Sequence, residues 1–270
     1  LLLDLIYFSV MKYLFVYLFI LIVPNFCLSQ TSDEYFFKGN INVNNNGIDW
    51  VPLFSRDKPS LIANFSLGKD RFSISPLIRY ELEGFQPWGV DIWWNYKIKQ
   101  RGKFNFDIGG VLPGVINQRI NIFDKKLPST VLQPWVSAIV NPNFSYAISE
   151  SFKLTISYFE VIPLKIVNKD QLKSGRVLIL SPSIKQFLIM DKVYFNWVPI
   201  IYTIQIEDTK TGLFSAQTLN IGIINSPFSI STVMNKPIYF GDLSGKKFDW
   251  NIGLNYSFDL KLKKNEKNKL

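Results

Sequence analysis

Apolar and polar residues alternate along the chain, and the alternation is most regular near the C-terminal end. Between Phe248 and Leu260 every even-numbered residue is apolar and every odd-numbered residue is polar or glycine. A period of two over thirteen residues predicts a β-strand with one apolar and one polar face. A strand of this length is long for a soluble protein and close to what a tilted strand needs to cross a bilayer. Aromatic residues lie near both ends of the apolar face, as is typical at membrane interfaces.

The same alternation recurs upstream and predicts an all-β chain of about twelve antiparallel strands, within a range of about ten to fourteen. The clearest further strands are predicted over Ser60–Leu67, Arg71–Glu83, Trp88–Ile98 and Leu132–Ile148. Shorter or less cleanly two-faced strands are predicted over Phe37–Val43, Lys103–Ile108, Phe152–Tyr158, Val177–Ile189, Val193–Ile206, Leu213–Ile223 and Phe228–Met234.

Short and longer links alternate between these strands, which is typical of a barrel whose two chain ends lie on the same side. The longer links include Pro113–Thr130, Pro163–Gly175 and Asn235–Lys247. Ile48–Phe54 also alternates and follows Asn44–Gly47, a good hairpin turn. Counting it as a strand would break the alternation of links, so residues 36–54 are expected to form one bulged first strand or to include a short inner segment.

The two-faced pattern also fits a soluble β-sandwich or a lipocalin-like barrel, in which the apolar faces would point inward. The polar faces favour a transmembrane barrel, because they are dominated by asparagine, serine, glycine and paired charges. Three prolines also lie on apolar faces: Pro76, Pro134 and Pro142.

Through Phe248–Leu260, Trp88–Ile98 and the alternating links, the chain resembles the outer-membrane β-barrel proteins of Gram-negative bacteria. The resemblance is architectural and covers Gln30–Leu260. It implies a porin-like barrel with both termini in the periplasm, in contact with outer-membrane lipid and lipopolysaccharide. It also implies folding by the barrel-assembly machinery.

The N-terminal region has the composition of a targeting segment. Residues 1–10 precede Met11 and are expected to be upstream translated sequence. Residues 11–29 are expected to form a signal peptide, because Lys12 is followed by an apolar run that ends at the small residues Cys27 and Ser29. A membrane anchor, or lipidation at Cys27, is the alternative. Residues 30–260 would then form the barrel, and residues 261–270 a basic, disordered periplasmic tail.

Composition excludes several functions. The chain has no histidine and a single cysteine. The outer-membrane phospholipases, acyltransferases and omptin-type proteases that share the expected architecture depend on histidine, so their mechanisms are excluded. We expect no enzyme, no catalytic residue, no metal and no cofactor. The formal charge is +9, but its lysines follow no helical pattern, so we predict no nucleic-acid partner.

The polar faces are expected to line the lumen. Simple hairpin registers would place Arg79 opposite Asp91, Asn95 opposite Asp107, and Lys99 opposite Lys103. The last pair predicts an anion-attracting mouth. The lumen-lining candidates are Arg71, Arg79, Glu81, Asp91, Lys97, Lys99, Lys103, Asp107, Lys153 and Asp249. The candidates in the outer loops, which would face lipopolysaccharide, are Arg119, Lys125, Lys126, Lys169 and Lys173.

Two functions follow from these candidates. If the charged groups line a narrow aqueous path, the protein is a passive channel or a transport-related barrel for small solutes. If they pair with one another and fill the interior, the protein is a structural or surface-interaction barrel with a plugged lumen and no conductance. A barrel of about twelve strands lies between filled small barrels and open porins, so its size does not decide between them.

Overall fold

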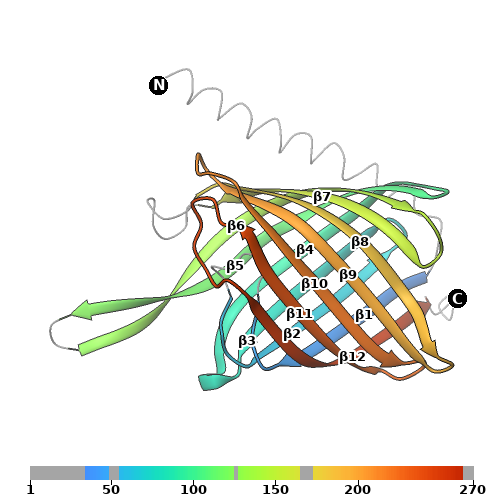
Figure 1. Ribbon diagram of the computed structural model, residues 1–270, viewed down its shortest axis with the longest axis horizontal. Coiled ribbons are helices and arrows are strands. Elements are labelled where there is room, and N and C mark those ends of the chain that lie inside the picture. The colour runs from blue at the N-terminus through green and yellow to red at the C-terminus, as the bar shows by residue number, and fades with distance from the viewer. Residues whose placement is uncertain (1–33, 49–54, 125–126, 165–172, 264–270) are drawn as a thin grey trace, which may run out of the picture.

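A computed structural model describes residues 34–48, 55–124, 127–164 and 173–263 (Figure 1). The expected signal peptide, Cys27 and residues 264–270 of the expected tail lie outside the described residues. No helix within the described ranges is long and apolar enough to cross a membrane. The strands are β1 (Glu34–Asn44), β2 (Ser60–Lys69), β3 (Phe72–Glu81), β4 (Gln86–Arg101), β5 (Phe104–Asp124), β6 (Leu127–Ala147), β7 (Phe152–Pro163), β8 (Gly175–Met190), β9 (Val193–Ile206), β10 (Gly212–Ile223), β11 (Phe228–Tyr239) and β12 (Asp249–Lys263), with a short 3₁₀ helix, η2 (Glu83–Phe85), between β3 and β4.

The strands form one closed barrel, in which each strand is antiparallel to its neighbours and β1 pairs with β12. The β1–β12 ladder runs without a break from Glu34 opposite Lys263 to Asn44 opposite Gly253. Closure leaves no free sheet edge around the barrel, which satisfies the backbone hydrogen bonds that lipid cannot. The prediction of about twelve strands in a closed antiparallel barrel is confirmed.

Links of two kinds lie at opposite ends of the barrel. Five tight turns, together with Glu34 and Lys263, define what we call the turn end, which lies at the right in Figure 1. The opposite end, the loop end, carries η2 and the longer loops at residues 45–59, 164–174, 207–211 and 240–248. The alternation predicted from the sequence is therefore confirmed, with the hairpin between β5 and β6 as a special case.

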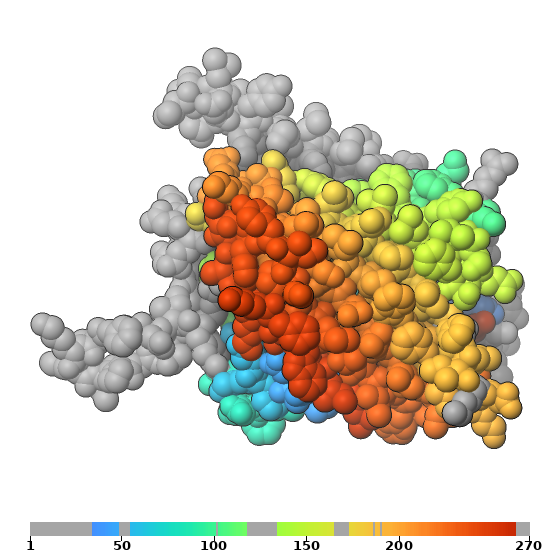
Figure 2. Space-filling model, in the orientation of Figure 1, coloured from blue at the N-terminus to red at the C-terminus, as the bar shows by residue number. Residues whose placement is uncertain are grey.

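The barrel is apolar outside and polar inside. On β12, Trp250 and Ile252 are 49% and 51% exposed, whereas Asn251 between them is 5% exposed. Large apolar side chains cover the outer surface of other strands in the same way. Figure 2 shows the face of the barrel that β8–β12 form, with side chains packed side by side. An apolar exterior with a polar interior is the arrangement of a transmembrane barrel. A soluble barrel would have the reverse.

The sequence-based boundaries were wrong in two places. Pro113–Thr130 is not a loop, because β5 and β6 continue as a ladder to Asp124 opposite Leu127 and project beyond the rest of the barrel (Figure 1). Asn44–Gly47 has the composition of a hairpin turn, but Asn45 and Asn46 bond to β12, which agrees with not counting a hairpin there. The first residues of the expected tail, from Lys261 to Lys263, belong to β12 and pair with β1. Most of Ile48–Phe54 lies outside the described residues.

Candidate functional site in the barrel lumen

The lumen is the enclosed polar space of the molecule and the natural place for a functional site. Its wall is chemically uneven. Asparagine and serine dominate the side formed by β11, β12, β1 and β2, whereas apolar residues dominate the side formed by β7–β10 near the loop end. Charged groups gather beside β3 and β4 and at both ends of the barrel.

We call the asparagine- and serine-rich wall the amide strip. It follows alternate residues of β12, from Asp259 at the turn end to Asp249 at the loop end, and the residues of β1 that face them. Asn42 Nδ2 donates to Asn255 Oδ1 at 2.9 Å and to Ser231 Oγ at 3.3 Å. The further members are Asn40, Asn44, Ser229, Asn251 and Ser257. The strip carries no formal charge between its two ends, so it offers only neutral donors and acceptors.

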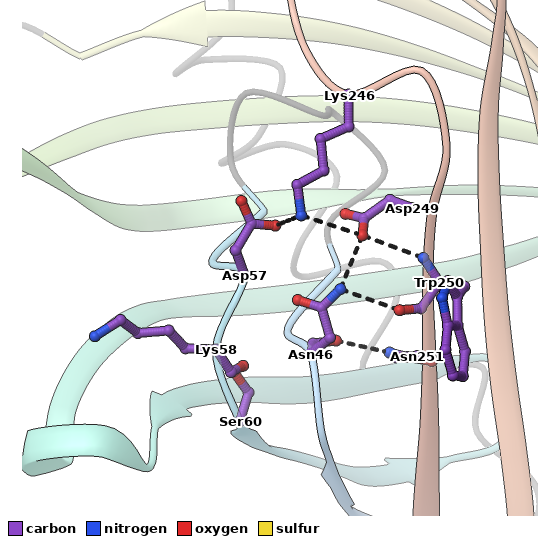
Figure 3. Close-up of polar contacts among 8 residues, drawn as sticks. All are labelled: Asn46, Asp57, Lys58, Ser60, Lys246, Asp249, Trp250 and Asn251. Carbon is purple, nitrogen blue, oxygen red and sulfur yellow. Dashed lines mark hydrogen bonds and ion pairs between the residues drawn. The ribbon is translucent and has the colours of Figure 1, made fainter.

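At the loop end the strip is extended by side-chain hydrogen bonds together with one backbone hydrogen bond. The Asn45 N–H donates to the Ile252 carbonyl at 3.2 Å, and Asn45 Oδ1 accepts from the Ile252 N–H at 2.8 Å. Asn46 Nδ2 donates to the Trp250 carbonyl at 3.0 Å, and Asn251 Nδ2 donates to the Asn46 carbonyl at 3.0 Å (Figure 3). The asparagine run therefore lengthens the seam that closes the barrel.

A buried ion pair joins β3 to β4. The guanidinium of Arg79 donates to the carboxylate of Asp91, and both side chains are buried. The register differs from the predicted one: Arg79 stands opposite Gly89, and Asp91 stands opposite Leu77. The predicted direct opposition was wrong, but the two residues remain on the same face because the register differs by an even number. The pair forms diagonally across the strands, beside the small Gly89.

Trp88 lies inside the barrel rather than on the lipid face as the alternation predicted. The β3–β4 ladder passes from Arg79 opposite Gly89 to Tyr80 opposite Pro87, so Trp88 is the extra residue of a β-bulge. Its side chain is fully buried, with the guanidinium carbons of Arg79 and Arg56 at 5.4 and 5.9 Å from its ring centroid. Cation–π attraction therefore links the wall to the loop at residues 45–59.

Arg56 and Lys58, in the described part of the loop between β1 and β2, lie against the barrel wall near this ion pair. Arg56 donates to the backbone carbonyls of Trp88 and Asn117. Lys58 lies 3.5 Å from the buried carboxylate of Glu81 and 2.8 Å from that of Glu83. Arg56 therefore bonds to backbone carbonyls of β4 and β5, and Lys58 meets carboxylates of the β3–β4 region, so both side chains hold this loop against the wall.

A second contact joins the first loop to the last one. Lys246 Nζ donates to Asp57 Oδ1 at 2.5 Å and lies 3.6 Å from Asp249 Oδ1. Asn46 Nδ2 donates to the same Asp249 oxygen at 2.8 Å (Figure 3). The hydrogen bond to Asp57 raises the pKa of Lys246 above its ordinary value. We call the Asp57–Lys246–Asp249 contacts the loop tie.

An apolar cluster occupies the β7–β10 side of the lumen at the loop end. Tyr202 and Phe214 stack with ring centroids 5.2 Å apart, and the Tyr202 hydroxyl donates to Asn235 Oδ1 at 3.0 Å. Trp93 of β4 meets Phe159 of β7 edge-to-face at 6.2 Å, although two strands separate β4 from β7 in the wall. The remaining buried members are Val177, Ile179, Ile204 and Ala216, and Phe240 and Leu243 of the last loop pack onto them. The cluster therefore fills part of the loop end.

The charged candidates near the turn end form a separate group. Lys97 stands opposite Asp107 in the ladder. The positive charge of Lys153 also interacts with the Asp107 carboxylate, and the Asn95 side chain forms a hydrogen bond with it. Asn95 itself is opposite Gly109, not Asp107 as predicted. Lys99 is opposite Phe106 because of a bulge after Lys97, so the predicted Lys99–Lys103 pairing was wrong. The remaining two candidates, Arg71 and Lys103, are exposed at the turn end.

The outer-loop candidates are placed only in part. Lys173 Nζ lies 3.5 Å from Glu207, so this lysine links the β7–β8 and β9–β10 loops. Arg119 lies on the projecting part of β5, opposite Leu132 of β6. Lys125, Lys126 and Lys169 lie outside the described residues.

Two cavities lie at the two ends of the amide strip. The turn-end cavity, of about 600 Å³, is lined by Lys38, Asn40, Asn64, Ser66, Ser75, Ser257 and Asp259 together with Gly39 and Phe258. The loop-end cavity, of about 290 Å³, is lined by the loop-tie residues and by Ser55, Asn235, Pro237, Ser244 and Gly245. The same face of β12 therefore contributes Asp259 to one cavity and Asp249 to the other.

Sequence reasoning missed the neutral wall and the apolar cluster, because only charged residues were selected as lumen candidates. The signals were present. The asparagines of Phe248–Leu260 lie on its polar face, and Val177–Leu180 is apolar at every position. A continuous apolar run within an alternating barrel indicates a strand that meets lipid on one side and an apolar interior on the other.

Comparisons with known proteins return only distant structural similarities. No family model matches the chain, and neither does any curated relative. Similar solved structures include the NanC porin, with 11% identity over 82% of this chain and all of that one, at a TM-score of 0.46. An outer-membrane channel from Pseudomonas putida is 7% identical over 86% and 97% of the two chains, at a TM-score of 0.48.

A third similar structure is OmpT, an outer membrane protein of Vibrio cholerae. It is 6% identical over 85% of this chain and 99% of that one, at a TM-score of 0.36. At such identities the resemblance does not extend to function.

Proposed function

We propose that this protein is a barrel of the bacterial outer membrane that lets small solutes diffuse through its lumen, with both chain ends in the periplasm. The observation that carries the proposal is the amide strip. Its neutral donors and acceptors follow one wall from the turn-end cavity to the loop-end cavity. A solute moving along such a wall exchanges hydrogen bonds with water for hydrogen bonds with protein at little net cost.

A plugged structural barrel is the second candidate, and specific contacts favour it. The apolar cluster fills one side of the loop end, and the first loop is held against the other side by Arg56 and Lys58. The loop tie then joins the first and last loops. If these contacts leave no aqueous path, the protein is a structural barrel or one that interacts with partners through its surface and loops.

Planar-bilayer recording of the purified full-length protein separates the two candidates. Folding is checked first by heat-modifiable migration in gels. Discrete, reproducible current steps from folded protein are the expected result. If folded, heat-modifiable protein carries no current, the channel proposal is overturned and the plugged barrel remains.

Ion preference provides a second, finer measurement. Lys97 and Lys153 flank Asp107, so this part of the lumen carries one excess positive charge and should favour anions. Replacing Lys153 with glutamine should reduce the anion preference. Lys192→Gln, in the exposed turn between β8 and β9, removes the same charge away from the lumen and should leave the preference unchanged.

A further inference from the structure

The turn-end cavity is a wide, open hollow at the turn end of the lumen, with the volume of a small-molecule site. Its volume of about 600 Å³ lies within the range typical of small-molecule pockets. It opens beside the turn end and draws its lining from β1, β2, β3 and β12. Four strands of the closed wall thus converge on it, so its polar groups are held by backbone ladders instead of by loops.

Five of the nine residues that line this cavity carry a side-chain amide or hydroxyl group: Asn40, Asn64, Ser66, Ser75 and Ser257. Asn40 Nδ2 donates to Ser257 Oγ at 2.8 Å, and Ser75 Oγ donates to Ser66 Oγ at 2.8 Å. A hydroxyl has one donor and two acceptor positions, and a side-chain amide has two of each. These contacts therefore leave capacity for a ligand that both donates and accepts, as a hydroxylated molecule does.

The charges at the cavity cancel. Lys38 Nζ lies 2.7 Å from Asp259 Oδ2, and no other lining residue of the cavity is charged. An ion that leaves water for such a site loses hydration without gaining an opposite charge, whereas a neutral polyol replaces its water hydrogen bonds one for one. The lining therefore discriminates by charge and favours neutral solutes.

We propose that the turn-end cavity is a binding site for one small, uncharged, polyhydroxylated solute. This inference rests on the proposed function, because this solute is the one that the barrel passes. The cavity lies at one end of the amide strip, whose side chains are neutral donors and acceptors. The site thereby makes the lumen selective for neutral polyols over ions of the same size.

Three polyols of nearly equal size test the proposal: neutral sorbitol, anionic gluconate and cationic N-methylglucamine. Binding is measured by saturation-transfer NMR on the purified full-length protein in detergent, and passage by swelling of vesicles that contain the protein. Sorbitol should receive saturation and should enter vesicles faster than both ions. No transfer to sorbitol, or equal transfer to all three, would overturn the binding site.

Variants locate the binding. Ser66→Ala combined with Ser75→Ala removes two hydroxyls from the lining and should weaken sorbitol binding about tenfold, as expected for two lost hydrogen bonds. Asn40→Asp adds a negative charge and should shift the preference toward N-methylglucamine. Ser183→Ala is the matched control, because Ser183 faces the interior from β8 but does not line the cavity. Equal weakening in the control would overturn the location.

The two proposals fail in different ways. Ion currents without sorbitol binding would refute the selective site and leave the channel. Sorbitol binding that is lost in the serine variant, in a protein that passes neither ions nor polyols, would confirm the site and refute the channel.

Discussion

The side chain of Lys246, in the loop before β12, donates a hydrogen bond to Asp57, in the loop after β1, with Nζ and Oδ1 2.5 Å apart. The two residues are far apart in sequence and join the first and last loops at the loop end (Figure 3). Both side chains are about half exposed, so water and salt weaken the pair. The tie therefore holds the loops together but can open readily.

Replacing Lys246 with methionine should loosen the last loop without unfolding the barrel. An exposed ion pair contributes about 0.2–1 kcal/mol, so backbone amides of residues 240–248 should exchange hydrogen a few times faster. Hydrogen exchange with mass spectrometry at neutral pH measures this. Lys247→Met removes the same charge one residue along and should change the exchange less. Equal acceleration in both variants would contradict the tie.

The tie should also depend on pH. Since the hydrogen bond to Asp57 raises the folded-state pKa of Lys246 above its ordinary 10.5, its contribution is present below about pH 10.5. The contribution is lost as the pH rises through the raised pKa. NMR of lysine carrying a ¹³C label should show Lys246 titrating above its ordinary value, and Asp57→Asn should lower that pKa. An unchanged pKa in Asp57→Asn would show that the carboxylate does not hold the ammonium.

Replacing Asp91 with asparagine should destabilise the barrel far more than breaking an exposed ion pair. The Arg79 and Asp91 side chains are only 8% and 11% exposed, and neutralising one partner of such a pair costs about 3–5 kcal/mol. Asp259→Asn breaks the Lys38–Asp259 pair, whose side chains are more than half exposed, and should cost about 0–1 kcal/mol. Free energies of unfolding in lipid vesicles compare the two, and equal losses would contradict the burial.

The barrel could be predicted because its physical rule is local. An apolar exterior and a polar interior impose a period of two on every strand, so each predicted strand in the alternating set corresponds to a strand of the barrel. Val193–Ile206 matches β9 at both ends. The tight turns were also predictable, because they interrupt the alternation over a few residues.

The register and the lumen contacts could not be predicted in the same way. A bulge adds one residue to one strand without changing the local composition, so nothing near Trp88 indicates that its side chain turns inward. The same kind of shift after Lys97 separates Lys99 from Lys103. Contacts such as Trp93 with Phe159 depend on how the wall curves, which is a property of the closed barrel and not of any one strand.

Truncating Phe214 should open the loop end. Its side chain is fully buried between Tyr202 and Phe240, so Phe214→Ala leaves a void in the apolar cluster and should cost about 3–5 kcal/mol. If the cluster limits passage, single-channel conductance should rise in the folded variant. Phe228→Ala removes an exposed ring from the outer face and should leave conductance unchanged. An unaltered conductance in Phe214→Ala would show that the cluster does not limit the path.

A side chain at Gly89 should destabilise the barrel, because the Val115 carbonyl and the Arg79 side chain occupy the volume that a Cβ would fill. A Cβ added there would lie 2.7 Å from the Val115 carbonyl oxygen and 3.2 Å from Arg79 Nη2. The first of these atoms is backbone, so relief requires the β4–β5 ladder to shift, and overpacking of this kind costs about 1–3 kcal/mol. Gly89→Ala should therefore lower the free energy of unfolding in lipid vesicles.

Gly175→Ala is the matched control for this substitution, since a Cβ at Gly175 meets no atom closer than 3.6 Å. It should leave stability nearly unchanged. Combining Gly89→Ala with Asp91→Asn then tests the reason for the loss. If the added methyl acts by displacing Arg79 from Asp91, the double variant should lose less than the sum of the two single losses. Additive losses would place the whole effect in the contact with Val115.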